Sequence, residues 1–419
     1  DQDNPDTLIA ARKGSPLVIG IGKGEHFLAS DASPIIEYTK EVVYVNDYEI
    51  AIIKPDELIL KNLGNERQTP FIQKLDLELA AIEKGGYDHF MLKEIFEQPH
   101  TIYDCLRGRL DVVQGTITMS GIQNNIEQIK NANRILIIAC GTSWHAGLVA
   151  EYVIEELCRI PVEVEYASEF RYRNPIIHKG DMIIAISQSG ETADTLVAIE
   201  RAKEQGAVIL GIVNVVGSSI ARISHAGAYT HAGPEIGVAS TKAFTAQLTV
   251  LTMVALMIAK ERNTISHDRY IHLLNELNEV PEKVKHALEN AEHIKTVALK
   301  YKDVSDALFL GRGYNFPIAL VDESLPVVFV ATKDTYHEKI ISNIQEIKAR
   351  KGKVIAVITE GDATIMGMAD DVLPIPEADE LIAPIISTIP LQLFSYYIGV
   401  AKGFDVDKPR NLAKSVTVE

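Results

Sequence analysis

Loops rich in hydroxyl groups and glycine carry the residues whose types and spacing are best suited to chemistry. The first such loop, Ser187–Thr192 (SQSGET), follows an apolar run and leads into a helical stretch that begins near Ala193. Hydroxyls, an amide and backbone N–H groups at a helix N-terminus form a site for a phosphate or another anion. Ser and Thr are also favoured helix N-caps, so the loop predicts either a small phosphorylated ligand or capping alone.

A second loop, Cys140–Ser143, follows another apolar run. Gly141 permits close approach of a ligand to the backbone, and Thr142 and Ser143 offer two hydroxyls. Cys140 is interpreted as a small packed residue rather than a nucleophile, because the sequence places no histidine base beside it.

A third loop and the C-terminal segment carry one lysine each. Glu235–Lys242 precedes a helix, and its Lys242 is either a solvated surface charge or a cation that faces a phosphate. Pro409–Glu419 lies beyond the last helix and is either a frayed tail or a docking lid. In a lid, the amine of Lys414 would react with a carbonyl group.

Short runs of Ile, Val, Leu and Ala must position these loops. Helical lengths of chain separate most of these runs, a pattern typical of a parallel sheet that is buried on both faces. We therefore expect a doubly wound α/β domain. Its expected strands are Ile135–Ala139, Val162–Tyr166, Met182–Ile186 and Val208–Val213.

The same pattern recurs in the second half, with a strand and its glycine turn expected within Ala307–Gly313 and strands at Val327–Ala331 and Val354–Ile358. Gly141 and Gly313 are 172 positions apart, whereas Gln247 and Gln392 on corresponding helices are 145 apart, so the second copy is 27 residues shorter. Either the second sheet is built differently, or a helix and a strand are absent. We favour absence and expect a chain break between 317 and 325, at Leu320 and Val321.

The first 60 residues carry short alternating runs that predict strands of an antiparallel sheet, at Pro16–Ile21, Glu41–Val45 and Glu49–Ile53. So few strands cannot close a core, so we interpret them as the end of a domain whose beginning is missing. The opening residue is Asp1, and no signal peptide is visible. Residues 61–86 are expected to be a linker, and His89–Phe96 starts a helix.

Composition excludes several classes of function. The 419 residues carry a net charge of −16, which argues against nucleic acid or an anionic membrane as a partner. Three cysteines without a CxxC spacing and histidines without an HExxH pair indicate a reducing cytoplasm, no metal and no cofactor. The apolar stretch Ala243–Ala259 is interrupted by polar residues and is expected to be a buried helix.

These loops, together with Ala167–Arg173 and the tail Asn411–Glu419, resemble those of the glutamine:fructose-6-phosphate amidotransferase family, the glucosamine-6-phosphate synthases. The resemblance implies a glutaminase remnant over residues 1–60 and two doubly wound sugar-isomerase (SIS) sandwiches at 87–265 and 266–410. It also implies an active-site tail at 411–419.

Carried over residue by residue, the resemblance implies that Lys414 opens the sugar ring and forms a Schiff base with the ketose. Val238 and Ala413 would contribute backbone contacts, with Ser240 nearby. Cys140 and Gly141 belong to the loop that holds the substrate. The residues implied to hold the sugar phosphate are Thr142, Ser143, Ser187, Gln188, Ser189 and Thr192.

The chain departs from the family pattern in two places. It starts at Asp1, where the family has a cysteine nucleophile, so it cannot hydrolyse glutamine by itself. The shortened region near 320 is where the family carries its carboxylate base and a histidine that assists ring opening. Glu191 is not an evident substitute, because it is better placed to stabilise a helix N-terminus.

The implied activity is the synthase half of such an enzyme. Ammonia from glutamine, delivered through the missing N-terminal domain, converts fructose 6-phosphate to glucosamine 6-phosphate in a cytoplasmic homodimer. Two alternatives stay open. One is a non-catalytic sensor of a sugar phosphate with the same fold, and the other is a related deglycase or isomerase.

Overall fold

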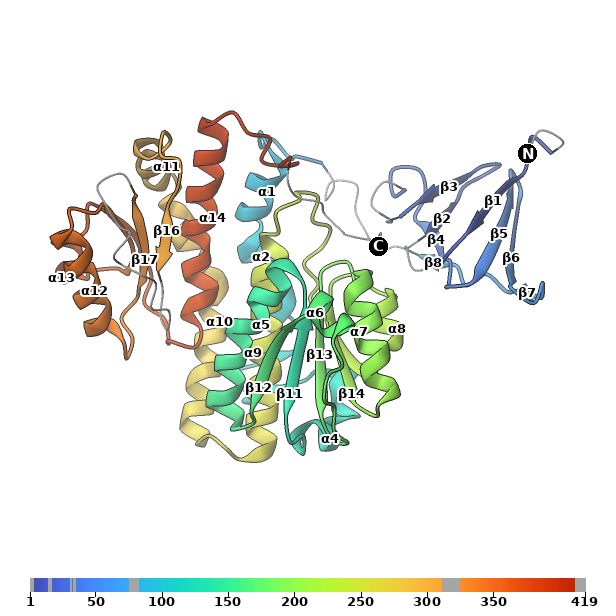
Figure 1. The fold of residues 1–419 in the computed structure, drawn as a ribbon, viewed down its shortest axis with the longest axis horizontal. Coiled ribbons are helices and arrows are strands. Elements are labelled where there is room, and N and C mark those ends of the chain that lie inside the picture. The colour runs from blue at the N-terminus through green and yellow to red at the C-terminus, as the bar shows by residue number, and fades with distance from the viewer. Residues whose placement is uncertain are drawn as a thin grey trace.

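The computed structural model describes residues 4–13, 17–30, 32, 35–74, 83–310 and 325–410. Figure 1 shows three regions in chain order. An N-terminal β unit, residues 4–74, lies to one side of a large α/β domain with a parallel sheet. A smaller α/β domain, with a second parallel sheet, lies on the opposite side.

The N-terminal unit contains two antiparallel sheets of four strands each, which include the three runs named from the sequence. Six buried residues between the sheets form a small core that includes Ile19, Val43 and Ile53. The expectation that this segment could not close a core is therefore wrong. One sheet has the order β1 (Leu8–Ala11), β5 (Glu49–Lys54), β6 (Glu57–Asn62) and β7 (Arg67–Gln68), and the other β3 (His26–Ala29), β2 (Val18–Ile21), β4 (Glu41–Tyr44) and β8 (Gln73–Lys74).

The boundary of the expected linker needs correction. β7 pairs with β6, and β8 pairs with β4, so the chain from 61 to 74 belongs to the two sheets. The polar residues of this stretch concealed its strands because two-residue strands on a sheet edge carry no hydrophobic alternation.

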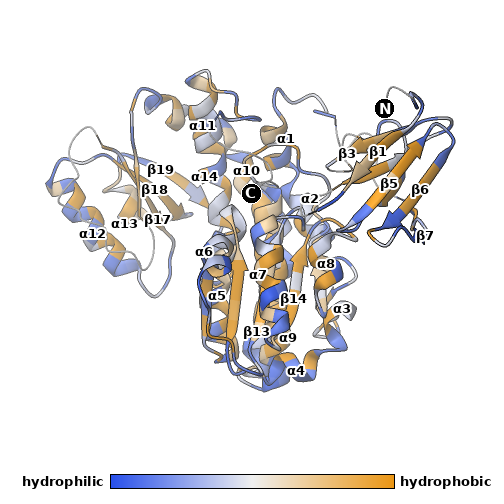
Figure 2. Cartoon of the chain, turned by 45° about the vertical axis from the view of Figure 1, so that its right-hand side comes forward, coloured by the Kyte–Doolittle hydropathy of each residue, from blue (hydrophilic) through white to orange (hydrophobic). Residues whose placement is uncertain are grey.

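The large domain contains a five-stranded parallel sheet of order β12-β11-β13-β14-β15. Its strands β11 (Ile135–Ala139), β12 (Val162–Tyr166) and β14 (Val208–Val213) have the predicted bounds, and β13 extends to Ser187 (Met182–Ser187). β15 (Ala226–Tyr229) was not predicted, because its four residues, AGAY, include small side chains and form too short a run to give a strand signal. Figure 2 shows β13 as largely hydrophobic, as expected of a strand that is covered on both faces.

Side chains of β11 alternate between two cores. Ile135 and Ile137 face the core that includes α5 (Gly141–Cys158) and α9 (Lys242–Arg262), whereas Leu136 and Ile138 face a core with α6 (Ala167–Tyr172), α7 (Ala193–Glu204) and α8 (Ser219–Ile223). This alternation is the period of two that a strand imposes. The doubly wound arrangement predicted for this domain is confirmed.

The second parallel sheet has the order β16 (Leu308–Leu310), β17 (Val327–Ala331), β18 (Val354–Thr359) and β19 (Asp371–Ile375). One face packs on α12 (His337–Ala349) and α13 (Ala363–Met366). The other face joins the main core through α10 (His267–Glu289), α11 (Ala291–Lys300) and α14 (Ala383–Ala401). The two α/β domains therefore share one continuous core, and Figure 1 shows α10 and α14 between their sheets.

The internal repeat is visible in the strand order. β16, β17, β18 and β19 follow one another as β11, β13, β14 and β15 do, and among the described residues no strand pairs with the outer edge of β16, where β12 lies in the first copy. The expected chain break between 317 and 325, at Leu320 and Val321, falls at residues outside the described ones, so it stays a prediction.

Helix α9 lies in the interior of the protein. The most apolar 18-residue window of α9 is 94% buried, which confirms the expectation of a core helix. α14 also has the length and composition of a possible membrane span, and half of its corresponding window is buried. The remaining elements are α1 (Phe90–Phe96), α2 (Gln98–Leu106), β9 (Leu110–Asp111), β10 (Thr116–Ile117), α3 (Ser120–Gln123) and α4 (Ile126–Lys130).

Candidate functional site

The parallel sheet brings two of the predicted loops to one edge. β11 and β13 are hydrogen-bonded neighbours, with Ile138 opposite Ala185. The residues that follow the two strands, Cys140 and Gln188, therefore leave the sheet on the same side, at its carboxyl end. This edge is where open parallel sheets bind their ligands.

The loop that follows β13 is organised by its own hydroxyls. Ser187 is buried, and its Oγ lies 3.0 Å from Thr192 Oγ1 and accepts a hydrogen bond from Gly190 N at 2.9 Å. Ser189 Oγ accepts a hydrogen bond from Glu191 N at 3.2 Å. Thr192 is the N-cap residue of α7, yet its side chain makes no capping hydrogen bond. Capping therefore does not explain the hydroxyl of Thr192.

Gly190 is required for the shape of this loop. Its φ is +68°, and a Cβ at this position would lie 2.0 Å from Ser218 Oγ. Both the left-handed conformation and the close approach exclude a side chain here. The backbone of the loop is therefore drawn tightly against the start of α8.

The loop that follows β11 forms the first turn of α5. Gly141 has a φ of +57°. Apart from its chain neighbours and the backbone of its own helix, no atom of the described residues lies within 4 Å of the position that a Cβ would take, so these residues leave this backbone open to a ligand. Ser143 is buried, and its Oγ accepts a hydrogen bond from Gln247 Nε2 at 3.0 Å. Burial raises the pKa of the Cys140 thiol, which fits a packed residue rather than a thiolate nucleophile.

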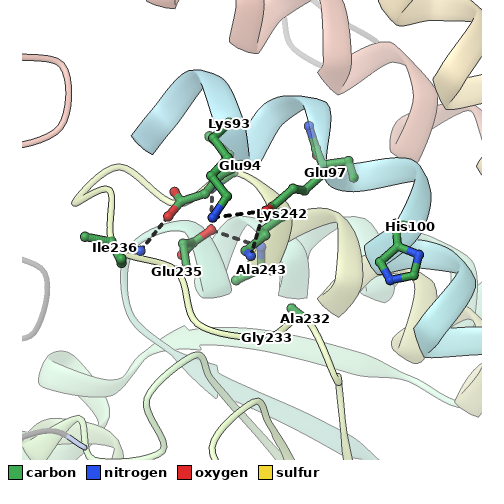
Figure 3. Close-up of polar contacts among 12 residues, drawn as sticks. Lys93, Glu94, Glu97, His100, Ala232, Gly233, Glu235, Ile236, Lys242 and Ala243 are labelled. Carbon is green, nitrogen blue, oxygen red and sulfur yellow. Dashed lines mark hydrogen bonds and ion pairs between the residues drawn. The ribbon is translucent and has the colours of Figure 1, made fainter. Parts of the chain in front are cut away.

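The third loop, residues 235–242, is folded around charged groups (Figure 3). Glu235 Oε1 accepts hydrogen bonds from Thr241 N at 2.8 Å and Ala243 N at 3.0 Å and so caps α9. Lys242 is only 4% exposed, and its Nζ lies 2.7 Å from Glu97 Oε2. Lys242 is therefore neither the solvated surface charge nor the phosphate-facing cation that the sequence suggested, since its charge is already paired with a carboxylate.

The two predicted ligand residues of this loop differ in what they offer. Val238 N donates to Asp407 O at 2.9 Å, so this N–H already has a partner. Ser240 Oγ lies 3.4 Å from Glu235 Oε1. The loop is thereby joined both to its own capping carboxylate and to the segment after α14.

Glu94 was missed by the sequence analysis. It lies on α1, is 2% exposed, and its Oε1 accepts hydrogen bonds from Ile236 N at 2.5 Å and Gly237 N at 3.2 Å (Figure 3). Burial and the nearby Glu235 raise the pKa of Glu94 to about 7. The helical run predicted at 89–96 placed this residue on a helix, but nothing local indicated that its carboxyl is buried.

Glu191 has the structural role that the sequence suggested, at a different helix. Its carboxylate accepts hydrogen bonds from Ser219 N at 2.9 Å and Ser219 Oγ at 2.7 Å, at the start of α8 rather than α7. Arg12 Nη2 from the N-terminal unit lies 3.1 Å from Glu191 Oε2. With these partners, Glu191 stabilises the loop and does not serve as a free base.

Two predicted residues, Ala413 and Lys414, lie outside the described residues. Over the ranges that the structure describes, no three His, Cys, Asp or Glu side chains gather into a set that could hold a metal ion. The remaining predicted ligands, in the loops after β11 and β13 and before α9, are all placed around the start of α5, α7 and α9.

The fold and these loops define a protein with paired SIS domains. The profile of the SIS domain matches residues 128–257 and 293–401. A solved structure described as the C-terminal domain of glucosamine-fructose-6-phosphate aminotransferase from Francisella tularensis has a TM-score of 0.73 and 36% sequence identity. It covers 78% of this chain and 100% of that chain.

The similarity to curated proteins extends over the whole sequence. The chain is 52% identical to glutamine–fructose-6-phosphate aminotransferase (isomerizing) from Bacteroides thetaiotaomicron, over 100% of this chain and 73% of that protein. It is also 52% identical to the protein of the same name from Chlorobaculum tepidum, over 99% of this chain and 72% of that protein. The chain therefore belongs to the glutamine–fructose-6-phosphate aminotransferase (isomerizing) family, and it is part of an enzyme.

The alignment also bears on the shortened second repeat. It runs over 449 positions with the Bacteroides protein, whereas the whole chain has 419 residues. At least 30 aligned positions of that relative therefore have no counterpart here. This number is close to the 27 residues by which the second repeat is shorter than the first.

Proposed function

We propose that this chain carries the synthase activity of its family, in which glutamine-derived ammonia and fructose 6-phosphate give glucosamine 6-phosphate. The observation that carries the proposal is the meeting of loops 140–143 and 187–192 at the carboxyl edge of one sheet. Buried hydroxyls and helix N-termini at such an edge are suited to the phosphate of a sugar.

The phosphate is assigned to the hydroxyls of the two loops. Ser187, Ser189 and Thr192 follow β13, and Thr142 and Ser143 follow β11, so donors from both loops converge on one anion. Gln188 adds its side-chain amide to the residues that follow β13. Cys140 and Gly141 contribute backbone that the ligand can approach closely. By the resemblance, Val238 contacts the sugar through its backbone, with Ser240 nearby. The carbonyl of Val238 is the atom assigned to this contact, because the N–H of Val238 is bonded to Asp407 O.

Lys414 is assigned the chemistry at the carbonyl carbon. A neutral amine attacks the ketose carbonyl, and loss of water gives a Schiff base that can be cleaved again. Ala413 would contact the sugar through its backbone. By the resemblance, the carboxylate that moves a proton between C2 and C1 belongs to a segment near 320, where we expect this chain to lack a helix and a strand.

The resemblance to the same family also supports an assignment of the domains and of the oligomeric state. The N-terminal unit is assigned to the end of a glutaminase domain, with 87–265 and 266–410 as the two SIS domains. The resemblance further supports a cytoplasmic homodimer with no metal or cofactor. Three free cysteines, two of them buried, fit a reducing compartment.

A titration with fructose 6-phosphate tests the placement of the phosphate. The change Ser189→Ala combined with Thr192→Ala removes two hydroxyls, and we expect the dissociation constant to rise at least tenfold. Thr296→Ala, at an exposed position of α11, serves as the control, because its hydroxyl donates to Glu292 O within the same helix. Unchanged affinity in the double variant would refute the placement.

The sensor alternative is not favoured. The relatives that match the whole chain are named as aminotransferases, which are enzymes. The reactive amine proposed at Lys414 would also have no role in a sensor, which only binds its ligand. An assay for glucosamine 6-phosphate with added ammonia distinguishes the two, since a sensor would bind the sugar phosphate without forming product.

A further inference from the structure

Arg12 connects the N-terminal unit to the loop assigned to the sugar phosphate. It follows β1 and is only 3% exposed. Within its own unit, Nη1 donates to Val45 O at 2.7 Å, and Nε lies 3.1 Å from Asp47 Oδ1. The guanidinium is therefore positioned by two contacts within the unit from which it comes.

The same guanidinium reaches across to the large domain. Its Nη2 donates to Glu191 Oε2 at 3.1 Å and to Ser219 Oγ at 2.8 Å. Glu191 N in turn donates to Ser189 Oγ at 3.2 Å. A continuous path of polar contacts thus leads from Arg12, through Glu191, to a hydroxyl that we assign to the phosphate.

The loop has few ways to adjust to the loss of this contact. Gly190 O accepts a hydrogen bond from Ile220 N at 3.0 Å, and both carboxylate oxygens of Glu191 bond to Ser219. Arg222, whose Nη2 donates to Ser219 Oγ at 2.9 Å, adds a second guanidinium beside the carboxylate. Removing Arg12 takes away the guanidinium that bonds directly to this buried carboxylate and leaves only the second guanidinium, that of Arg222, beside it, so the neighbours of Glu191 must move.

We infer that Arg12 is a positioning residue for the sugar-phosphate loop, acting on Ser189 through Glu191, and that it couples the placement of the N-terminal unit to sugar-phosphate affinity. This inference rests on the proposed function. Because coupling between two sites is reciprocal, sugar phosphate bound at the loop must also stabilise the docked position of the N-terminal unit.

A double-mutant cycle on the full chain measures this coupling. We expect Arg12→Met and Glu191→Gln each to raise the dissociation constant for fructose 6-phosphate about tenfold. The dissociation constant of the double variant should not exceed that of the weaker-binding single variant, because the two residues act along one path. Arg12→Lys should recover part of the affinity. Lys54→Met, which removes an exposed ion pair with Glu57 in the same unit, is the matched control and should bind as the wild type does.

Hydrogen exchange provides a readout that a purely structural role would not move. Arg12 N bonds to Glu49 O, and Tyr48 N bonds to Arg12 O, so both amides report on the N-terminal unit. Saturating fructose 6-phosphate should slow their exchange in the wild type but not in Arg12→Met. Protection of the 187–192 loop by the ligand should persist in both proteins.

The outcomes separate the inference from the function on which it rests. Wild-type chain that fails to bind fructose 6-phosphate would overturn the proposed function. Wild-type affinity in both Arg12→Met and Glu191→Gln would overturn the coupling alone. The same holds if fructose 6-phosphate protects the amides of residues 12 and 48 equally in the wild type and in Arg12→Met. If Arg12→Met does not fold, Arg12→Lys and Glu191→Gln decide, and wild-type affinity in both overturns the inference.

Discussion

The side-chain amide of Gln247 on α9 donates to the hydroxyl of Ser143 on α5, 3.0 Å away, in a position where both residues are buried. The contact fixes a predicted phosphate ligand from a helix that lies about a hundred residues further along the chain. Gln392, the counterpart of Gln247 in the second repeat, instead accepts from Gln98 Nε2 at 2.7 Å and donates to Thr241 O at 3.3 Å. Equivalent glutamines therefore stabilise the site in the first copy and the packing of α2 and α9 in the second.

Gln247→Met should weaken sugar-phosphate binding more than it weakens the fold. Met has a similar volume, and the Oε1 of Gln247 already lacks a hydrogen-bond partner in the described structure, so we expect a stability change of about 1 kcal/mol or less. Without its partner, the Ser143 hydroxyl is free to rotate, and the dissociation constant for fructose 6-phosphate should rise several-fold. Gln128→Met, at an exposed position of α4, is the control for both measurements. Equal affinity in the two variants would remove Gln247 from the site.

Lys414→Ala should abolish formation of glucosamine 6-phosphate in the complete enzyme while its thermal transition stays unchanged. The reason is that a terminal tail contributes little to the core, whereas the proposed Schiff base requires this amine. Borohydride reduction in the presence of fructose 6-phosphate, followed by peptide mapping, identifies the modified residue. Trapping of the sugar on a different lysine would refute the assignment.

Gly190→Ala should be more damaging than the same change at another left-handed glycine. At Gly206, which has a φ of +92° and an open surrounding, alanine introduces only backbone strain of about 1–2 kcal/mol. At Gly190 the new Cβ also collides with Ser218 Oγ. We therefore expect a lower urea midpoint and weaker sugar-phosphate binding for Gly190→Ala than for Gly206→Ala. Adding Ser218→Gly to Gly190→Ala should recover part of both losses, and no recovery would show that the collision is not their cause.

Glu94→Gln should flatten the pH dependence of stability. The pKa of Glu94, about 7 in the folded state, exceeds its ordinary value of 4.5. Between these values the folded state binds more protons than the unfolded state, so the contribution of Glu94 to the free energy of unfolding falls as the pH rises and levels off above about 7. Glu235 and Lys242 face the carboxyl, with opposite effects on its pKa.

Glutamine can still accept hydrogen bonds from Ile236 N and Gly237 N but has no charge to bury. The variant should therefore be more stable than the wild type at pH 8, by on the order of 2 kcal/mol, and similar to it at pH 4.5. Urea midpoints at several pH values measure this difference. Glu282→Gln, at an exposed position of α10, is the control and should follow the wild type. Parallel pH profiles for Glu94→Gln and wild type would contradict a raised pKa.

The amino-acid sequence alone determined most strands of the two parallel sheets, their repetition and the loops of the candidate site, but not the edge strands β15 and β19. Strands such as β11 and β14 are continuous apolar runs, and the loop 187–192 concentrates hydroxyls where a strand ends and a helix begins. These signals are local, because hydrophobic periodicity and turn chemistry act over a few residues. They are therefore visible without a structure.

Only the tertiary structure decided which charged groups are buried and with whom. Lys242 was ambiguous because nothing near it in the sequence announces Glu97, and Glu94 and Arg12 find their partners more than a hundred residues away. The edge strands β7 and β8 exist only because β6 and β4 offer free backbone groups to them. Such pairings depend on how distant elements pack. The low dielectric of the packed interior then determines how strongly the paired charges interact and how far their pKa values shift.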